Sequence, residues 1–385
     1  MHSLDQFAQA KLDDLEAGHL RRALAPTYRE DGLWVERGGK RLLSFSCNDY
    51  LNLSQHPATK RAAMAALERY GAGSGASRLV TGNHPLYAEL ESRLARMKET
   101  EGAVVFGSGY LANAGIIPVL VGRDGLVLVD ELAHACIYAG AQLSRGRVLT
   151  FRHNGLAHAR ELLAAHRAEH DRTLIVTDGV FSMDGDLAPV RELNDLANEF
   201  EAWLMTDDAH GIGVIGGGRG SSFIGGAKIN VPLQMGTLSK AIGAYGGYLC
   251  ASGPVIELMR NRARTLVYST GLPPAVVASA IAAIDVIETE PDYAALPAKK
   301  ARAFTRALNL PEAESPIVPV VIGEADKALK ASRLLEDEGF LAMAIRPPTV
   351  PDGTARLRFT FTAQHPDDEI ERAAALVREK IMVRA

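Results

Sequence analysis

The sequence predicts an α/β fold, with a large, mostly parallel β-sheet covered by helices on both faces and a smaller α+β unit after it. Between residues 56 and 251, short apolar runs bounded by Gly, Asp or Ser alternate with helical segments. Strands that are apolar throughout are typical of parallel sheets, because the connecting helices bury both faces. The chain has 385 residues, 47% of them hydrophobic and 23% charged, so it is long enough and apolar enough to enclose a large core.

Residues 1–44 predict an N-terminal helix followed by an arm. Apolar side chains recur at helical spacing over residues 3–17, which indicates an amphipathic helix that must dock on another surface. We expect an irregular course over residues 24–40 and a short strand over residues 42–46.

Residues 45–288 predict the large domain. The apolar segment 269–284 predicts a buried helix, because it is shorter than a membrane span and carries two adjacent prolines. Helices are expected at 56–70, 85–97, 110–121, 133–144, 155–170 and 190–200, and strands at 103–106, 126–129, 148–151, 173–177, 202–206 and 248–251.

Residues 289–385 predict the small C-terminal domain, to which the N-terminal arm contributes. The polar segments 288–292 and 297–302 resemble a linker between the two domains. Beyond them we expect strands at 317–322 and 356–362 and helices at 326–338 and 367–378.

The composition excludes several classes of protein. The formal net charge of −4 gives the protein no overall positive potential that would attract nucleic acid or an anionic membrane surface. The three cysteines lie far apart without a CxxC pair or zinc spacing, so we expect free thiols, no metal site and a reducing compartment. Charged residues interrupt the N-terminus, and a signal peptide is not expected. These observations predict a cytoplasmic protein.

Two carboxylates and a histidine follow the strand predicted at 202–206. Asp207 and His210 are three positions apart and could lie on one side of a tight turn, although an Asp at a strand end is often only a helix cap. The segment 211–216 matches GxGxxG, which suggests a nicotinamide cofactor. However, more glycines follow the motif, and a dinucleotide site also needs an acidic residue about 20 positions further on. No Asp or Glu lies between Gly211 and Glu257, so the segment predicts a loop instead.

Lys240 is the only charged residue between 229 and 256. A lysine without nearby charge is suited to desolvation, which lowers its pKa and makes the amine a nucleophile. A surface lysine, or one paired with a distant acid, is the alternative. Thr237 could bind a phosphate, and GxxxxGK[ST] is absent, so a Schiff-base cofactor such as pyridoxal phosphate (PLP) is favoured over a P-loop.

Ser108, Gly109 and Tyr110 follow a predicted strand and begin a helix. Free backbone N–H groups and the helix dipole at such a place can bind an anion, although an ordinary Gly-rich turn fits equally. His134 begins the next predicted helix and is ambiguous in the same way. Together with Lys240 and Asp207, these residues provide the lysine, carboxylate, phosphate site and stacking ring that a PLP enzyme needs.

The order of motifs resembles the α-oxoamine synthases, a family of fold-type I PLP transferases, over nearly the whole chain. The motifs are SCNDYL at 46–51, GSGASRLVTG at 73–82, TDGVFSMDG at 177–185, DDAHG at 207–211 and TLSK at 237–240. The resemblance implies a homodimer with shared active sites.

The resemblance also implies a role for each matching residue at the cofactor. Lys240 would bond to PLP and later remove the α-proton of the substrate, and Asp207 would pair with the pyridine nitrogen. His210 would contact the phenolic oxygen of the ring, with Ser182 close by, and His134 would stack on the ring. The phosphate would be held by Ser108, Gly109, Tyr110, Thr237 and, from the partner subunit, Thr270.

The substrate residues are implied on the same basis. Residues 355–362 alternate strictly, so Arg356 and Arg358 share one face of a strand. We expect Arg356 to be solvated, whereas the resemblance makes Arg358 the clamp for the amino-acid carboxylate, assisted by Asn48. Arg21, or the adjacent Arg22, would meet the far carboxylate of a pimeloyl chain.

The segment 345–358, which contains Thr349, is similar to the members that condense L-alanine with a pimeloyl thioester on the biotin pathway. The expected activity is therefore a decarboxylative condensation of these two substrates, with coenzyme A or acyl carrier protein as the thiol. The nearest alternative uses glycine and acetyl-CoA. A nicotinamide oxidoreductase and a non-catalytic binding protein are the alternatives from other classes.

Overall fold

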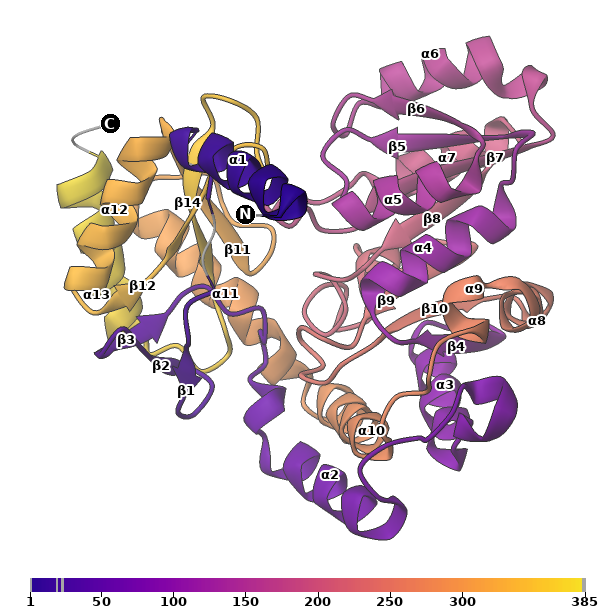
Figure 1. Cartoon of the computed structure of the whole chain (residues 1–385), viewed down its shortest axis with the longest axis horizontal. Helices are drawn as coiled ribbons and strands as arrows, with labels where there is room; N and C mark the ends of the chain where they lie inside the picture. Colours follow the sequence, from indigo (N-terminus) through magenta and orange to yellow (C-terminus); the bar gives the residue numbers. More distant parts are fainter. Residues whose placement is uncertain (1, 19, 22–23, 383–385) are drawn as a thin grey trace.

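The computed structural model describes residues 2–18, 20–21 and 24–382. It has two lobes, one built on a large sheet and one on two small sheets (Figure 1). Helices α10 (Pro274–Thr289) and α11 (Pro291–Ala307) follow each other and join the lobes.

Within the described residues, seven strands form the large sheet in the order β4-β10-β9-β8-β7-β5-β6. Strand β10 is antiparallel to both neighbours, and the pairs from β9 to β6 are parallel, which confirms the predicted, mostly parallel sheet. The strands are β4 (Gly102–Phe106), β5 (Gly125–Asp130), β6 (Arg147–Phe151), β7 (Arg172–Asp178), β8 (Trp203–Asp207), β9 (Leu233–Thr237) and β10 (Gly247–Ala251). Sequence reasoning did not identify β9, because Gln234 and Gly236 interrupt its apolar run.

Helices cover both faces of this sheet, because alternate side chains of each strand point to opposite faces. On β5, Val127 and Val129 pack in one hydrophobic cluster with α4 (Gly109–Leu120), α5 (Ala135–Ser144) and α8 (Gly253–Arg262). Leu126 and Leu128 pack in another cluster with α6 (Leu156–His166) and α7 (Val190–Glu199). Helices α3 (Pro85–Met97) and α10 cover β4 and β10, and α2 (Pro57–Tyr70) packs outside α10.

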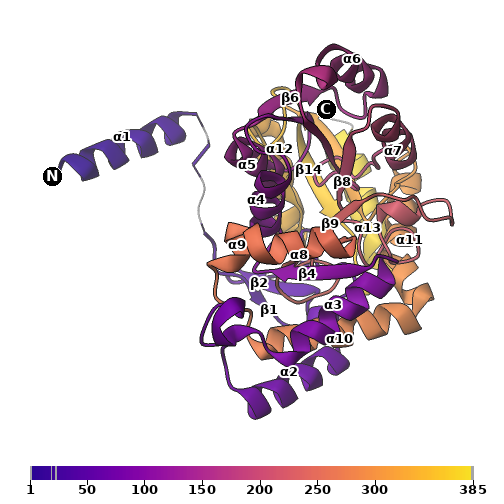
Figure 2. The ribbon, with the colours of Figure 1, turned by 90° about the vertical axis from the view of Figure 1, so that its right-hand side faces the viewer.

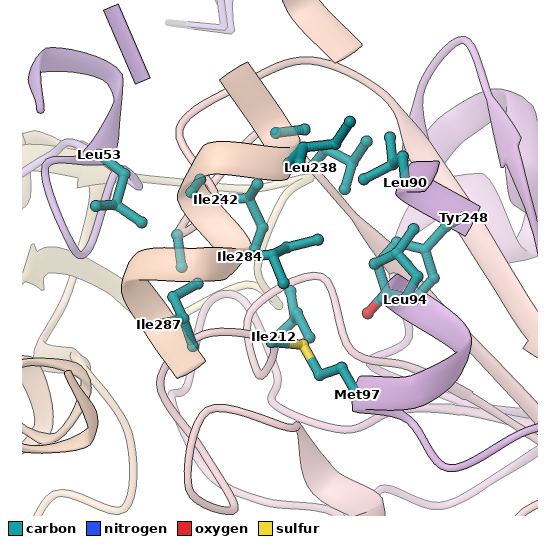
Figure 3. Packing of buried hydrophobic residues seen from close by; sticks show 14 of the residues in the cluster. Leu53, Leu90, Leu94, Met97, Ile212, Leu238, Ile242, Tyr248, Ile284 and Ile287 are labelled. Carbon is teal, nitrogen blue, oxygen red and sulfur yellow. The ribbon is translucent and has the colours of Figure 1, made fainter. Parts of the chain in front are cut away.

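A buried helix was predicted within the apolar segment 269–284, and residues 274–284 form part of α10, whereas residues 269–273 precede it. Ile284 and Ile287 of α10 pack against Leu238 and Ile242, which flank Lys240 in the sequence (Figure 3). This cluster therefore supports the turn that carries the lysine. None of the helices in the described part of the chain combines the length and the apolar character needed to cross a bilayer.

The small lobe combines the N-terminal arm with the C-terminal residues. Residues 24–40 were expected to be irregular, and this prediction is wrong, because β1 and β2 form there. Strand β1 pairs with β2, and β2 pairs with β3. Strand β12 joins β3 in parallel, so a tertiary contact completes this sheet. The elements are β1 (Tyr28–Arg29), β2 (Trp34–Arg37), β3 (Lys40–Ser44), β11 (Ile317–Gly323), β12 (Phe340–Leu341), β13 (Met343–Ile345), β14 (Ala355–Thr360), α12 (Ala325–Asp337) and α13 (Asp367–Leu376).

The segments 288–292 and 297–302 were expected to be a linker, which is also wrong. They belong to α10, the junction at Glu290, and α11. Ala294, Ala301 and Phe304 of α11 are buried, and the last two belong to the core of the small lobe. The charged residues of this segment made it look like a linker, although α11 has a buried apolar face.

Helix α1 (Ser3–Ala17) forms as predicted, but no residue of it is buried in the described chain. It extends away from both lobes (Figure 2). The apolar side chains Leu4 and Phe7 are 70% and 63% exposed. Among the described residues, no surface therefore covers this helix, which was expected to dock.

The glycine-rich segment 211–220 is a loop, as predicted, and a buried ion pair holds it. Lys98 Nζ donates to Asp208 Oδ2 at 2.8 Å and also to the carbonyl oxygen of Arg219. Both charged side chains are 0% exposed. Gly220 has φ +94°, and a Cβ there would lie 2.4 Å from Asp208 Oδ2, so the loop needs glycine at this position.

We expect Asp208→Asn to lower the free energy of unfolding by about 3–5 kcal/mol, because Lys98 would remain buried without a compensating charge. Urea unfolding followed by circular dichroism measures the change. Lys330→Ala, which breaks the exposed pair with Asp326, is the control and should cost less than about 1 kcal/mol. Equal losses in the two variants would contradict a role for the buried pair.

Candidate active site

The ends of five strands meet at one edge of the large sheet. Strands β5, β7, β8 and β9 are parallel, and β4 runs in the same direction, because both β4 and β9 are antiparallel to β10. Ligands bind at this edge in open α/β sheets. A cavity of about 170 Å³ lies there, lined by Gly109, Tyr110, His134, Cys136, Asp178, Asp207, Ala209, His210, Thr237 and Lys240. Most of the predicted cofactor residues are among them.

Asp207 is the last residue of β8 and is 2% exposed. Its Oδ2 accepts a hydrogen bond from Asn113 Nδ2 at 2.8 Å, and its Oδ1 accepts one from the backbone N–H of Ala209 at 2.9 Å. The adjacent Asp208 turns away to Lys98. The structure thus separates two carboxylates that are neighbours in the sequence.

Lys240 lies in the turn after β9, and its side chain faces the cavity. Its Nζ is 2.7 Å from His210 Nε2. Burial lowers the pKa of the amine to about 8, although Asp207 and Asp178 act in the opposite direction. The lysine that has no charged neighbour in the sequence therefore lies near two carboxylates in space, and burial still makes its neutral form far more populated than that of an exposed lysine.

His210 is held by contacts on both ring nitrogens. Nε2 faces Lys240, and Nδ1 lies 2.6 Å from the hydroxyl oxygen of Tyr50. Burial, followed by the charges of Lys240 and Arg358, holds the pKa of His210 well below its usual value. The ring is therefore neutral at neutral pH.

His134 is the N-cap residue of α5. Its Nδ1 accepts a hydrogen bond from the backbone N–H of Cys136 at 3.3 Å and lies 2.8 Å from Cys136 Sγ. Its own backbone N–H donates to Asp178 Oδ2 at 2.8 Å. These contacts hold the ring at the cavity, and burial lowers its pKa.

Sequence reasoning missed Asn113, Cys136 and Asp178. Asp178 ends β7 beside Asp207, and burial, followed by the charge of Asp207, raises its pKa well above the usual value. Its place at a strand end was a signal that could have identified it. Asn113, which also donates to Cys136 Sγ at 3.1 Å, lies inside α4, where the sequence carries no such signal.

The other end of the cavity begins at the N-terminus of α4. Ser108 Oγ accepts a hydrogen bond from the backbone N–H of Leu111 at 3.1 Å, so this side chain caps the helix. Gly109 and Tyr110 line the cavity in the first turn. A Cβ on Gly247 would lie 2.5 Å from the carbonyl oxygen of Ser108, so glycine allows β10 to pack behind this turn. Thr237 Oγ1 donates to the carbonyl oxygen of Gly246 at 2.7 Å.

Arg358 lies on β14 of the small lobe and is 7% exposed. Both of its terminal nitrogens donate to Asn48 Oδ1 at 3.2 Å, and Nε donates to the carbonyl oxygen of Ser182. Arg356 was expected to be solvated, which is wrong, because it is 5% exposed and pairs with Asp184. The face of β14 that carries both arginines is turned toward the large lobe rather than toward water.

The structure does not bring the remaining predicted residues to the cavity. Arg21 pairs with Glu16 at 3.3 Å beside α1, and Arg22 lies outside the described residues. Thr349 lies on an exposed loop between β13 and β14. Thr270 is exposed and forms a β-bridge with Ser77.

These residues fit PLP by the chemistry of their donors. An amine of lowered pKa and a buried carboxylate face one cavity, with a histidine ring at its wall. The start of α4, a helix of 12 residues, provides N–H groups and a helix dipole suited to a phosphate. Lys240, Asp207, His134 and the Gly109–Tyr110 turn would hold the cofactor.

The comparisons with known proteins identify the family of the chain. The family model for aminotransferase class I and II matches residues 40–377. An 8-amino-7-oxononanoate synthase from Methylocella silvestris is 65% identical over 345 residues, 90% of this chain and 98% of that protein. The one from Beijerinckia indica is 59% identical over 377 residues, 98% of each chain.

Solved structures show the same fold. A serine palmitoyltransferase from S. paucimobilis, solved with a bound PLP–myriocin aldimine, has a TM-score of 0.92 at 29% identity and covers 98% of both chains. The 8-amino-7-oxononanoate synthase from Francisella tularensis has a TM-score of 0.75 at 25% identity, covering 89% of this chain and 98% of that one. The predicted fold of the fold-type I PLP enzymes is confirmed. The chain therefore belongs to the aminotransferase class I and II family and, within it, to the 8-amino-7-oxononanoate synthases.

Proposed function

We propose that this chain condenses L-alanine with a pimeloyl thioester to form 8-amino-7-oxononanoate in biotin biosynthesis. A carbon–carbon bond forms between the α-carbon of alanine and the thioester carbonyl, the thiol leaves, and the alanine carboxylate departs as carbon dioxide. The observation that carries the proposal is that the Lys240 amine and the Asp207 carboxylate face one cavity. The relatives that cover nearly the whole chain are named for this product.

When bound, PLP supplies an electron-poor ring that stabilises negative charge at the α-carbon of the amino acid. Asp207, oriented by Asn113 and by the N–H of Ala209, would hold a proton at the pyridine nitrogen. Lys240 would bond to the cofactor and later remove the α-proton, which its lowered pKa favours near neutral pH. His134 would stack on the ring, and His210 would donate to its phenolic oxygen.

Arg358 would bind the carboxylate of alanine. Its guanidinium lies beside Asn48, the residue expected to assist it, and burial strengthens a charge-assisted bidentate contact. Because Arg358 comes from the small lobe and Lys240 from the large one, substrate binding would depend on how the two lobes are held together.

We also propose a cytoplasmic homodimer with shared sites, in which Thr270 and Arg21 serve the partner subunit. Exposed apolar side chains surround the bridge between Ser77 and Thr270, with Val80 at 74% and Tyr268 at 73% exposure. Helix α1 is also not packed against any other part of the chain that the structure describes. A large exposed apolar patch is typical of an interface. Coenzyme A and acyl carrier protein are the two proposed thiol carriers.

The alternative activities have less support. The glycine and acetyl-CoA reaction is not favoured, because the relatives are named for 8-amino-7-oxononanoate. A nicotinamide site would need a helix that starts within residues 211–216, and the structure has a loop there.

Lys240→Ala should lose covalent attachment of PLP and at least about a thousandfold in turnover, because no other group in the cavity can replace the amine. Borohydride reduction followed by mass spectrometry measures the attachment. In the unsubstituted enzyme, the rate of attachment should rise with pH and reach half its maximum near pH 8, since only the neutral amine attacks. Lys327→Ala, at an exposed position on α12, is the control. Retained attachment in Lys240→Ala would refute the assignment.

Arg358→Lys should raise the KM for L-alanine by about 10- to 100-fold and leave the KM for the pimeloyl thioester nearly unchanged. Lysine keeps the positive charge but cannot form the bidentate hydrogen bonds that arginine makes with a carboxylate. Steady-state kinetics with each substrate varied in turn measures both constants. Arg372→Lys, at an exposed ion pair on α13, is the matched control. Equal changes in both KM values would argue against a clamp for the amino acid.

The substrates themselves can be tested with the purified, PLP-loaded enzyme. L-Alanine with pimeloyl-CoA or pimeloyl-acyl carrier protein should release carbon dioxide and free thiol and yield 8-amino-7-oxononanoate by mass spectrometry. Glycine with acetyl-CoA should give at least about tenfold less product, because one methyl group in a fitted pocket discriminates by roughly that factor. Faster turnover with glycine and acetyl-CoA would overturn the proposed function.

A further inference from the structure

Tyr50 lies directly behind the active site and has no role in the mechanism proposed above. It is 0% exposed and belongs to the segment between β3 and α2. Its hydroxyl oxygen is 2.6 Å from His210 Nδ1 and 3.3 Å from Asn48 Oδ1. Burial raises the pKa of Tyr50 to about 12, so the hydroxyl keeps its proton.

A continuous chain of hydrogen bonds passes through this hydroxyl. Lys240 Nζ contacts His210 Nε2 at 2.7 Å, and Tyr50 contacts the opposite ring nitrogen. Asn48 Oδ1, the second neighbour of the Tyr50 hydroxyl, also accepts from Arg358. The expected cofactor lysine and the expected carboxylate clamp are therefore connected through three neutral side chains, those of His210, Tyr50 and Asn48.

The direction of these hydrogen bonds depends on the state of Lys240. A neutral imidazole has one N–H and one acceptor nitrogen, and an ammonium group can only donate. When Lys240 is protonated, Nε2 must accept and Nδ1 must carry the proton. Nδ1–H then donates to Tyr50, whose own O–H is left to donate to Asn48 Oδ1.

The opposite arrangement follows when the lysine nitrogen no longer donates, as when it is bonded to another group. The Tyr50 O–H can then turn to Nδ1, which is the nearer of its two acceptors, at 2.6 Å against 3.3 Å. The ring proton resides on Nε2, which faces the cavity. A hydroxyl suits both arrangements, because it can donate and accept.

We propose that Tyr50 is a positioning residue that lets His210 exchange its tautomer when Lys240 stops donating, so that Nε2–H is presented to the cavity. The effect on turnover rests on the proposed function, whereas the tautomer is a property of the chain without cofactor or substrate. Three charged or titratable side chains besides Tyr50 act on this ring, namely Lys240, Arg358 and His134.

The test is ¹⁵N NMR of the histidine-labelled apoprotein at neutral pH, with His210 assigned from a His210→Gln variant. In the unsubstituted chain, we expect Nδ1 to be protonated and Nε2 to be unprotonated. Lys240→Met keeps the length of the side chain and removes its N–H groups, and it should reverse the two assignments. The same tautomer in both proteins would overturn the proposal.

Tyr50→Phe provides the second arm, since it removes only the hydroxyl. In the Lys240→Met background, it should abolish the preference for the Nε2-protonated form. The matched control is Tyr248→Phe, because Tyr248 is equally buried and its hydroxyl has no hydrogen-bond partner among the described residues (Figure 3). Equal spectra for the two phenylalanine variants would contradict a role for the Tyr50 hydroxyl.

In the PLP-loaded enzyme, Tyr50→Phe should lower kcat by about tenfold, the factor expected for one neutral hydrogen bond, with less change in the KM for alanine. Tyr248→Phe should leave kcat within about twofold. If the enzyme proves to use other substrates, the tautomer measurements remain valid. If Lys240→Met leaves the His210 tautomer as it is, this inference is wrong even when the proposed reaction is demonstrated.

Discussion

The constraint on which the rest of the structure depends is the burial of one amine beside acidic side chains at the end of a parallel sheet. Lys240 is nearly enclosed, and burial of the ammonium form costs free energy, which lowers the pKa to about 8. Asp207 and Asp178 act in the opposite direction and keep the group titrating near the physiological range rather than far below it. The position of this amine depends on the large sheet and on the loop after β8. It also depends on the hydrophobic cluster that contains Leu238 and Ile242.

The end of β8 shows how one strand can supply both chemistry and stability. Side chains of successive residues in an extended segment point to opposite sides. Asp207 accordingly faces the cavity, while Asp208 meets Lys98 in the core and anchors the glycine-rich loop. The two carboxylates are identical in charge and adjacent in sequence, and only their direction gives them different functions.

Contacts behind the cavity decide the orientation of each reactive side chain. Asn113 and Cys136 connect the carboxylate of Asp207 with the ring of His134, and Tyr50 connects His210 with Asn48 and Arg358. These residues are hydrogen-bonded within the protein, so they restrict the side chains that face the cavity. By fixing the positions of these side chains, a protein sets the electrostatic environment of a cofactor, while the cofactor itself supplies the chemistry of the reaction.

The sequence by itself determined the alternation of strands and helices, because periodicity can be read along the chain. It also singled out Lys240 and Asp207, which the structure brings to one cavity. It did not reveal that residues 24–40 contain β1 and β2, which pair with each other and with β3, or that α11 is a helix, whose buried face packs in the core of the small lobe. It also missed Asn113, Cys136 and Asp178, and it placed Arg356 in water. Only the tertiary structure decided these points, because burial and hydrogen bonding depend on residues that are distant in sequence and adjacent in space.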